Sequence, residues 1–158
     1  KSNSLKLTGK NMENEIKFYS VNGKYGEFSN FARFPITIGK VIWPTTEHYF
    51  QAQKFKGTKF ETKIRKLKRP NEAAQLGRDR SLPLRRDWES VKIEVMKEAL
   101  IAKFTQHDDL RELLISTGDS VLIEHTDNDS YWGDGGNGNG KNILGKLLMD
   151  VRSVIRKS

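Results

Sequence analysis

The sequence predicts an α+β fold, a compact helix-rich single domain with a small β-sheet. Apolar residues recur with helical spacing over residues 88–104 and again over 143–155. Short runs that alternate apolar and polar residues, as strands do, begin near Glu15 and Ile36, and an apolar run typical of a buried strand begins at Val121. Because glycine or proline separates these runs, and 158 residues suffice for one hydrophobic core, we expect a single domain.

Composition limits the possible partners. The chain has no cysteine, which excludes disulfides and thiolate chemistry and fits a reducing compartment. A net charge of +8 favours a polyanion, either nucleic acid or a small phosphorylated substrate. No apolar run is long enough to span a membrane, and the N-terminus shows no signal pattern. We therefore expect a soluble, cytoplasmic, monomeric protein without a membrane partner.

The first half of the chain predicts a strand, a hairpin and a helix. Residues 1–14 are polar and are expected to be a flexible N-terminal segment or a cloning remnant, so the domain is expected over residues 15–158. Alternation predicts a strand over 15–20 and a hairpin over 36–43 that turns at Gly39 and Lys40. Thr45 or Thr46 is a natural N-cap for a helix over residues 47–55.

Helices dominate the second half. The segment Arg69-Pro70-Asn71 starts a short helix over residues 72–76 that Gly77 closes, and Trp88 opens the longest helix, with a core stripe over residues 88–104. Asp108 or Asp109 can cap a helix over 110–117, which Gly118 ends. A buried strand over 121–125 and an amphipathic helix over 143–155 complete the domain.

Residues 127–145, which we call the acidic glycine loop, combine six of the thirteen glycines with Asp127, Asp129 and Asp134. Glycine permits positive φ and close approach to a ligand, and a helix N-terminus that follows offers N–H groups to an anion. The alternative is a mobile surface turn, which Tyr131 and Trp132 make less attractive. The loop matches neither the phosphate loop of nucleotide hydrolases nor the dinucleotide fingerprint.

Glu47, Gln51 and Lys54 are spaced to share one face of the predicted helix over 47–55. Aromatic residues on its other sides indicate a mostly buried helix, so this polar stripe is expected to be buried or to border a cleft. Burial penalises a carboxylate, which suits a general acid or base. The structural alternative is that Lys54 is simply the ion-pair partner of Glu47. His48 has no second His or Cys at metal spacing, so we expect no metal, and no cofactor.

Several motifs, in one order, resemble those of the NADAR family, and especially its YbiA-like members. The resemblance covers roughly residues 16–155 and is carried by GEFSNF at 26–31, WPTTEHYFQAQK at 43–54, GRDR at 77–80, RDW at 86–88, VLIE at 121–124, YWGDGG at 131–136 and GKNILG at 140–145. It implies the YbiA-like (NADAR) fold and an N-glycosidase. Some members resemble enzymes that cleave phosphoribosylaminopyrimidine intermediates of riboflavin biosynthesis, whereas others remove ADP-ribose from guanine bases in nucleic acid.

The resemblance also implies roles for individual residues. Glu47 would be the acid/base or would orient the sugar 2-hydroxyl, and Lys54 would be an amine nucleophile that traps the opened sugar as a Schiff base. Trp88 would stack on the base or belong to the core. Asp129 and Asp134 would hold ribose hydroxyls or support a cationic transition state. The implied binding set is Phe28, Ser29, Asn30, Phe31, His48, Arg78, Tyr131, Trp132, Gly133, Gly135, Gly138 and Asn142, of which Arg78 and the N–H groups after Gly138 and Asn142 would meet phosphate.

Two other classes of protein are compatible with these features. A non-catalytic module that binds ADP-ribose or an NAD derivative would have the same pocket without turnover, and a plain nucleic-acid-binding module would explain the positive charge. Between the two glycosidase substrates, family likeness favours the phosphoribosylated pyrimidine and the charge favours ADP-ribosylated nucleic acid.

Overall fold

A computed structural model describes residues 14–158, which form two compact units. The central unit comprises Asn30–Leu110, and the terminal unit comprises the described residues up to Ser29 together with Arg111–Ser158. The division falls inside one helix, α6 (Asp108–Ser116). The N-terminal segment expected over residues 1–14 lies, apart from Asn14, outside the described residues.

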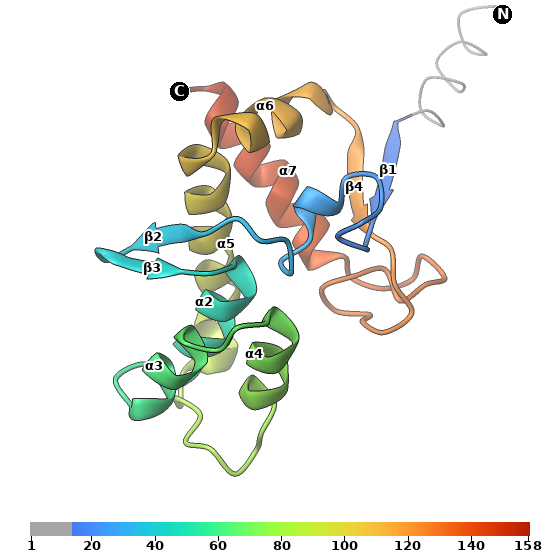
Figure 1. The fold of residues 1–158 in the computed structure, drawn as a ribbon. Helices are drawn as coiled ribbons and strands as arrows, with labels where there is room; N and C mark the ends of the chain where they lie inside the picture. Colours follow the sequence, from blue (N-terminus) through green and yellow to red (C-terminus); the bar gives the residue numbers. More distant parts are fainter. Residues whose placement is uncertain (1–13) are drawn as a thin grey trace, which may run out of the picture. The chain divides into compact units, whose positions relative to one another are not determined.

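The central unit consists of a hairpin and a group of helices (Figure 1). Its elements are β2 (Ile36–Ile38), β3 (Val41–Trp43), α2 (Thr46–Gln53), α3 (Lys59–Arg65), α4 (Pro70–Gly77) and α5 (Trp88–Gln106). The two strands pair antiparallel, with Ile36 opposite Trp43. Gly39 and Lys40 have φ values of 61° and 65°, as a two-residue hairpin turn requires, so the predicted hairpin and its turn are confirmed.

Helix α2 is the centre of this unit, since it packs against α3, α4, α5 and β3. The Thr45 hydroxyl caps it by accepting a hydrogen bond from the His48 N–H. All eight residues of α2 are buried, which confirms the prediction of a mostly buried helix. Its polar side chains have therefore lost most of their water and must find partners inside the protein.

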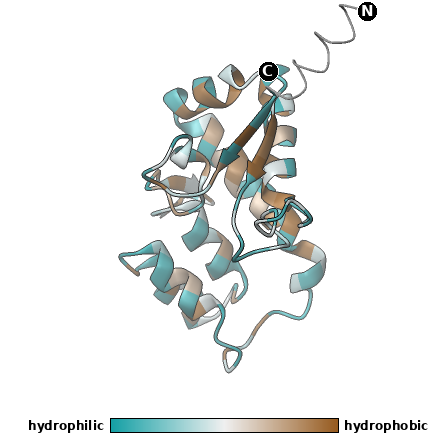
Figure 2. Ribbon diagram, turned by 90° about the vertical axis from the view of Figure 1, so that its right-hand side faces the viewer, coloured by the Kyte–Doolittle hydropathy of each residue, from teal (hydrophilic) through white to brown (hydrophobic). Residues whose placement is uncertain are grey.

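The terminal unit is built on a parallel strand pair. Strands β1 (Glu15–Phe18) and β4 (Val121–Glu124) pair with Glu15 opposite Val121, and α7 (Ile143–Arg156) packs against β4. A short 3-10 helix, η1 (Gly26–Phe28), follows β1. The hydrophobic core of the terminal unit contains Phe18, Phe28, Leu114, Leu122, Leu144, Leu148 and Val151. Figure 2 shows brown and teal residues alternating along the helices, as amphipathic helices require.

The helix-rich α+β class is therefore confirmed, but the small sheet is two separate two-stranded sheets within the described residues. Alternating runs identify strands without identifying their partners, because pairing is decided by tertiary packing. Element boundaries shift by one to two residues from those predicted. Gly77 is the last residue of α4 rather than the residue beyond it, and α6 begins at Asp108 itself. Among residues 14–158, no helix is both long and apolar enough to cross a membrane.

Candidate active site

The polar stripe of α2 forms one connected group in the central unit. The Gln51 Nε2 donates a hydrogen bond of 2.8 Å to Glu47 Oε2, and the Lys54 Nζ donates one of 3.2 Å to the carbonyl of Gly77. Only 8% of Glu47 and 7% of Gln51 is exposed. A buried carboxylate and an amine thus lie on the same face of a buried helix, as the spacing predicts.

Two aromatic rings lie beside the Lys54 ammonium. Its Nζ lies 5.9 Å from the ring centroid of Phe50 and 5.8 Å from that of Trp88. The two rings meet edge to face with centroids 5.0 Å apart, and Trp88 is only 5% exposed. The ring of Trp88 is therefore buried in this unit and lies beside the Lys54 ammonium, where a cation–π contact is favourable.

The pKa of Lys54 is lowered from its ordinary value of 10.5. Burial is the main cause, because an ammonium loses its hydration there, and the attraction of Glu47 opposes it. The positive charges of Arg78 and Lys92 lower the pKa further, and Glu89 raises it slightly. The amine is thus easier to deprotonate than a surface lysine, which a nucleophilic role requires.

His48 has a structural position. The side chain is fully buried, with Nε2 2.8 Å from the Leu67 carbonyl and Nδ1 2.8 Å from the Thr45 hydroxyl. Because a carbonyl oxygen can only accept, the ring proton lies on Nε2 and the Thr45 hydroxyl donates to Nδ1. Burial lowers the pKa of His48, although its hydrogen bond to Leu67 opposes this. Both nitrogens are used within the fold, which does not favour the substrate contact expected from the family motif.

Asn30 supports the start of α2. Its Oδ1 accepts from the Thr46 hydroxyl at 2.8 Å, and its carbonyl accepts from the Glu47 N–H at 3.2 Å. The other two central-unit residues of the expected binding set, Phe31 and Arg78, are exposed. Arg78 acts on Lys54 through its charge, as described above.

The acidic glycine loop lies in the terminal unit and is organised by Asp134, which is 4% exposed. Its Oδ1 accepts from the N–H groups of Thr126 and Gly136 at 3.1 and 2.9 Å, and its Oδ2 accepts from His125 Nδ1 at 2.8 Å. Burial raises the pKa of Asp134, but the hydrogen bonds from His125, Gly136 and Thr126 outweigh it and hold the pKa below the ordinary 3.8. This carboxylate is therefore ionised and built into the loop.

Two more predicted residues of the loop, Tyr131 and Trp132, bind a second aspartate through their backbone. Asp129 Oδ1 accepts from the N–H groups of Tyr131 and Trp132 at 2.9 and 2.8 Å. Their rings meet edge to face, with centroids 5.1 Å apart. The Asp129 carboxylate thus fixes the backbone of these two adjacent aromatic residues.

Backbone carbonyls occupy the N-terminus of α7, where an anion was expected. The N–H groups of Asn142, Ile143 and Leu144 donate to the carbonyls of Gly133, Tyr131 and Trp132. The Asn142 side chain pairs with the backbone of β4, accepting from the Glu124 N–H and donating to the Leu122 carbonyl. These N–H groups hold the loop against the helix and have no proton left for a phosphate.

The remaining predicted residues of the terminal unit differ in their surroundings. Phe28 is fully buried and packs on Phe18 and Tyr25, so it belongs to the core. The Ser29 N–H donates to the Gly26 carbonyl. Three glycines complete the set: Gly133 is buried, where a side chain would press on the Glu124 carbonyl, while Gly135 and Gly138 have φ values of 73° and 85°.

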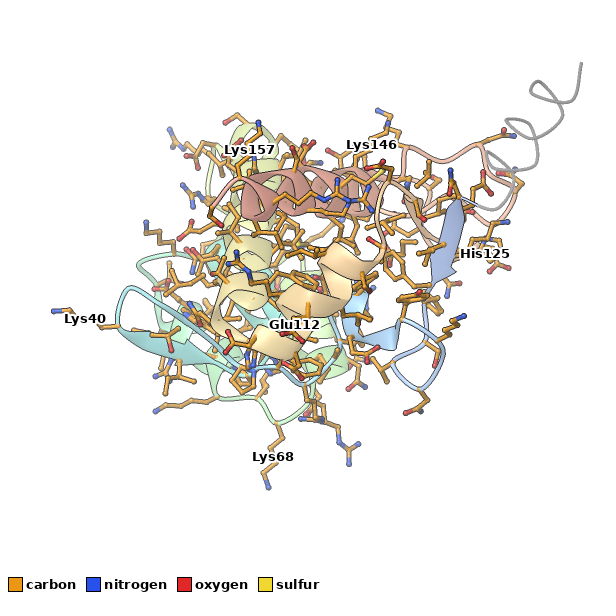
Figure 3. The ribbon with its side chains drawn as sticks, turned by 90° about the horizontal axis from the view of Figure 1, so that it is seen from above. Lys40, Lys68, Glu112, His125, Lys146 and Lys157 are labelled. Carbon is orange, nitrogen blue, oxygen red and sulfur yellow. The ribbon has the colours of Figure 1, made fainter. Side chains whose placement is uncertain are left out.

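Sequence reasoning missed His125. Its imidazole lies at the end of β4 beside β1 (Figure 3), and 45% of the side chain is exposed. The buried Asp134 carboxylate orients it through Nδ1. A His that follows a strand, nine positions before an Asp in a glycine-rich loop, is a signal that could have indicated this pair.

Removing the Asp134 carboxylate is expected to destabilise the protein. Asp134→Ala leaves the buried Thr126 N–H and the part-buried Gly136 N–H without their acceptor, so the free energy of unfolding should fall by about 3 kcal/mol. Asp127→Ala, an exposed change in the same loop, should cost less than about 0.5 kcal/mol. Urea denaturation of both variants measures the difference, and equal midpoints would show that Asp134 does not hold the loop.

No set of three or more His, Cys, Asp or Glu side chains within residues 14–158 is arranged to hold a metal. A polar cavity of about 430 Å³ lies in the terminal unit, between β1, Tyr25 and the end of α6. None of the predicted site residues lines it. The central-unit group at Glu47 and Lys54 therefore remains the candidate active site.

Known proteins resemble this chain over most of its length. The family model described as the NADAR domain matches residues 17–156. The chain is 58% identical to N-glycosidase YbiA of Escherichia coli over 140 residues, which cover 89% of this chain and 88% of that protein. It is 38% identical to riboflavin biosynthesis protein VVA0006 of Vibrio vulnificus, covering 92% of this chain and 40% of that protein.

A solved structure also resembles this one. The NMR structure of Escherichia coli YbiA superposes with a TM-score of 0.84 at 56% identity, covering 90% of this chain and 84% of that one. Sequence and structure thus agree over nearly the same residues. The chain belongs to the NADAR domain family.

Proposed function

We propose that this protein is an N-glycosidase that hydrolyses the bond between a ribose C1 and a nitrogen, next to phosphate. The observation that carries the proposal is the buried Glu47 carboxylate and the desolvated Lys54 amine on one face of α2, beside Trp88. Its relative YbiA is named an N-glycosidase. A merely positively charged binding module has no need of such a buried pair.

The chemistry assigns one role to each group. In its neutral form, Lys54 attacks C1 as the C1–N bond breaks, and the departing nitrogen takes a proton from the Glu47 carboxyl group. The attack leaves two protons on the Lys54 nitrogen, and the Glu47 carboxylate passes one of them to the ring oxygen as the ring C1–O bond opens and the C1–N bond becomes an iminium. Water then adds to C1 and the C1–N bond breaks, which releases the sugar, restores the amine and returns one proton to Glu47.

Two substrates have this bond next to phosphate. The name of the Vibrio vulnificus relative supports a phosphoribosylaminopyrimidine of riboflavin biosynthesis. The net charge of +8 supports ADP-ribosylated guanine in nucleic acid as the second candidate. The exposed Arg78 lies close enough to Lys54 to lower its pKa. It is therefore near the proposed reacting group and can bind a phosphate of either substrate.

For the terminal unit, sugar or base contacts by Asp129, Tyr131 and Trp132 remain a separate proposal, which their grouping supports. Changing Trp132 to alanine should raise KM if it contacts the substrate. We further propose one NADAR domain over residues 15–158, a monomer in solution, and a cytoplasmic location, to which the absence of cysteine is suited.

The test offers both substrates to the purified protein and separates the products by chromatography. Release of the aminopyrimidine and ribose 5-phosphate supports disposal of the riboflavin intermediate. Restored guanine with free ADP-ribose supports the nucleic-acid reading. If neither is cleaved but ADP-ribose binds, the protein is a non-catalytic reader and the proposal is wrong. Binding of nucleic acid that is salt-sensitive and independent of Glu47 would instead indicate a plain nucleic-acid module.

A further inference from the structure

The Gln51 side chain lies between Glu47 and Gly77 of α4. Its Nε2 donates to Glu47 Oε2 at 2.8 Å, while its buried Oε1 has no hydrogen-bond partner among residues 14–158. The amide orientation follows from chemistry, because an oxygen turned toward the carboxylate would be repelled. The orientation that lets Gln51 donate to Glu47 therefore leaves its own Oε1 without a hydrogen bond, and a buried acceptor without a hydrogen bond lowers the stability of the fold.

Gly77 makes this arrangement possible. A Cβ on Gly77 would overlap the Gln51 amide and would lie 2.7 Å from its Cδ. The φ of Gly77 is not in the left-handed region, so lack of space, rather than backbone conformation, requires glycine here. The Gly77 carbonyl also accepts the hydrogen bond of Lys54 Nζ. Gly77 of α4 therefore contacts the Gln51 side chain and also accepts the hydrogen bond of Lys54.

We propose that Gln51, seated on Gly77, is a positioning residue that holds the Glu47 carboxylate in place and prevents it from closing on the Lys54 ammonium. The inference rests on the proposed function for its catalytic consequence, but the positioning itself can be tested without a substrate. Two opposite charges on one buried helix face would otherwise form an ion pair, which would disable both the acid and the nucleophile.

The charges that face Lys54 set the direction of the expected effect. They are Glu47 on its own helix, Arg78 after α4, and Lys92 and Glu89 on α5. Lys92 already pairs with Glu89 at 2.6 Å, so Glu47 is the negative charge whose position loss of the Gln51 hydrogen bond would change. A Glu47 carboxylate that reaches Lys54 stabilises the ammonium, which raises the pKa of Lys54 and reduces the neutral amine at a given pH.

The decisive variants are Gln51→Met, which keeps the side-chain length without the amide, and Gly77→Ala, which displaces the amide. Gln53→Met is the matched control, because Gln53 is equally buried on α2 and donates to another glutamate, Glu61, at 3.2 Å. The first readout is the rate at which acetic anhydride labels Lys54 across pH, followed by peptide mass spectrometry. In both decisive variants the midpoint should move to higher pH, and in Gln53→Met it should not.

The second readout is turnover. Gln51→Met should lower kcat about 30-fold with KM within about twofold, because a misplaced acid affects chemistry more than binding. An unchanged labelling midpoint in both decisive variants overturns the inference, even if wild-type activity is present. No turnover by the wild type, with the midpoint shifted, overturns the proposed function and leaves the positioning intact. If Gln51→Met does not fold, the labelling midpoint of Gly77→Ala alone tests the inference.

Discussion

Replacing Glu47 with glutamine is expected to lower kcat by about 10³-fold, the range of a lost general acid or base. Glutamine has nearly the same size and can still accept the Gln51 N–H, so the buried helix should keep its packing. It cannot release a proton to the departing nitrogen. Steady-state kinetics on whichever ribosyl-nitrogen substrate the wild type cleaves measures the loss.

A second buried-glutamine contact offers the control for this variant. Glu61 accepts a hydrogen bond from Gln53 much as Glu47 accepts one from Gln51. Glu61→Gln should therefore keep kcat within about twofold of the wild type, since surrounding contacts are retained. If Glu47→Gln also kept full activity while folding normally, Glu47 would not be the acid/base.

Lys54 should form a covalent adduct with the sugar that borohydride traps. Reduction adds a hydride to C1 of the iminium and leaves a stable secondary amine, so the tryptic peptide that contains Lys54 gains the mass of the reduced sugar. Lys54→Arg keeps the positive charge but removes the nucleophile, so it should abolish trapping and lower kcat by about 10³-fold or more. Trapping at another lysine, or none during turnover, would remove Lys54 from the nucleophilic role.

The pH dependence of trapping follows from the lowered pKa of Lys54. The neutral amine is the reactive form, so trapping should increase with pH and reach half its maximum below 10.5, the ordinary lysine value. Arg78→Ala removes a positive charge that lowers this pKa and should move the midpoint upward. A wild-type midpoint at or above 10.5 would contradict the burial of a functional amine.

Helical spacing and composition were enough to predict the stripe on α2. Glu47, Gln51 and Lys54 lie four and then three residues apart, so any helix places them on one face, and the aromatic residues around them require burial. The hairpin was equally predictable, because its turn needs positive φ at two adjacent positions. In both cases the structure depends on neighbours in the chain.

What the sequence could not predict depends on contacts between distant segments. No pattern in the neighbouring sequence indicates that the Gln51 amide packs against Gly77, since the two residues lie on different helices. The carbonyls that occupy the N-terminus of α7 likewise come from a loop whose path depends on the Asp134 carboxylate. A glycine-rich loop before a helix predicts free N–H groups only when no nearby carbonyl competes for them.

The most direct test of the central claim is hydrolysis in water enriched in ¹⁸O, with mass spectrometry of both products. Cleavage of the C1–N bond through Lys54 should place the heavy oxygen on the sugar at C1, release the base as an unlabelled amine, and leave the phosphate oxygens unlabelled. Heavy oxygen in a phosphate group, or a base still joined to its ribose, would show that the protein breaks a different bond and would contradict the N-glycosidase account.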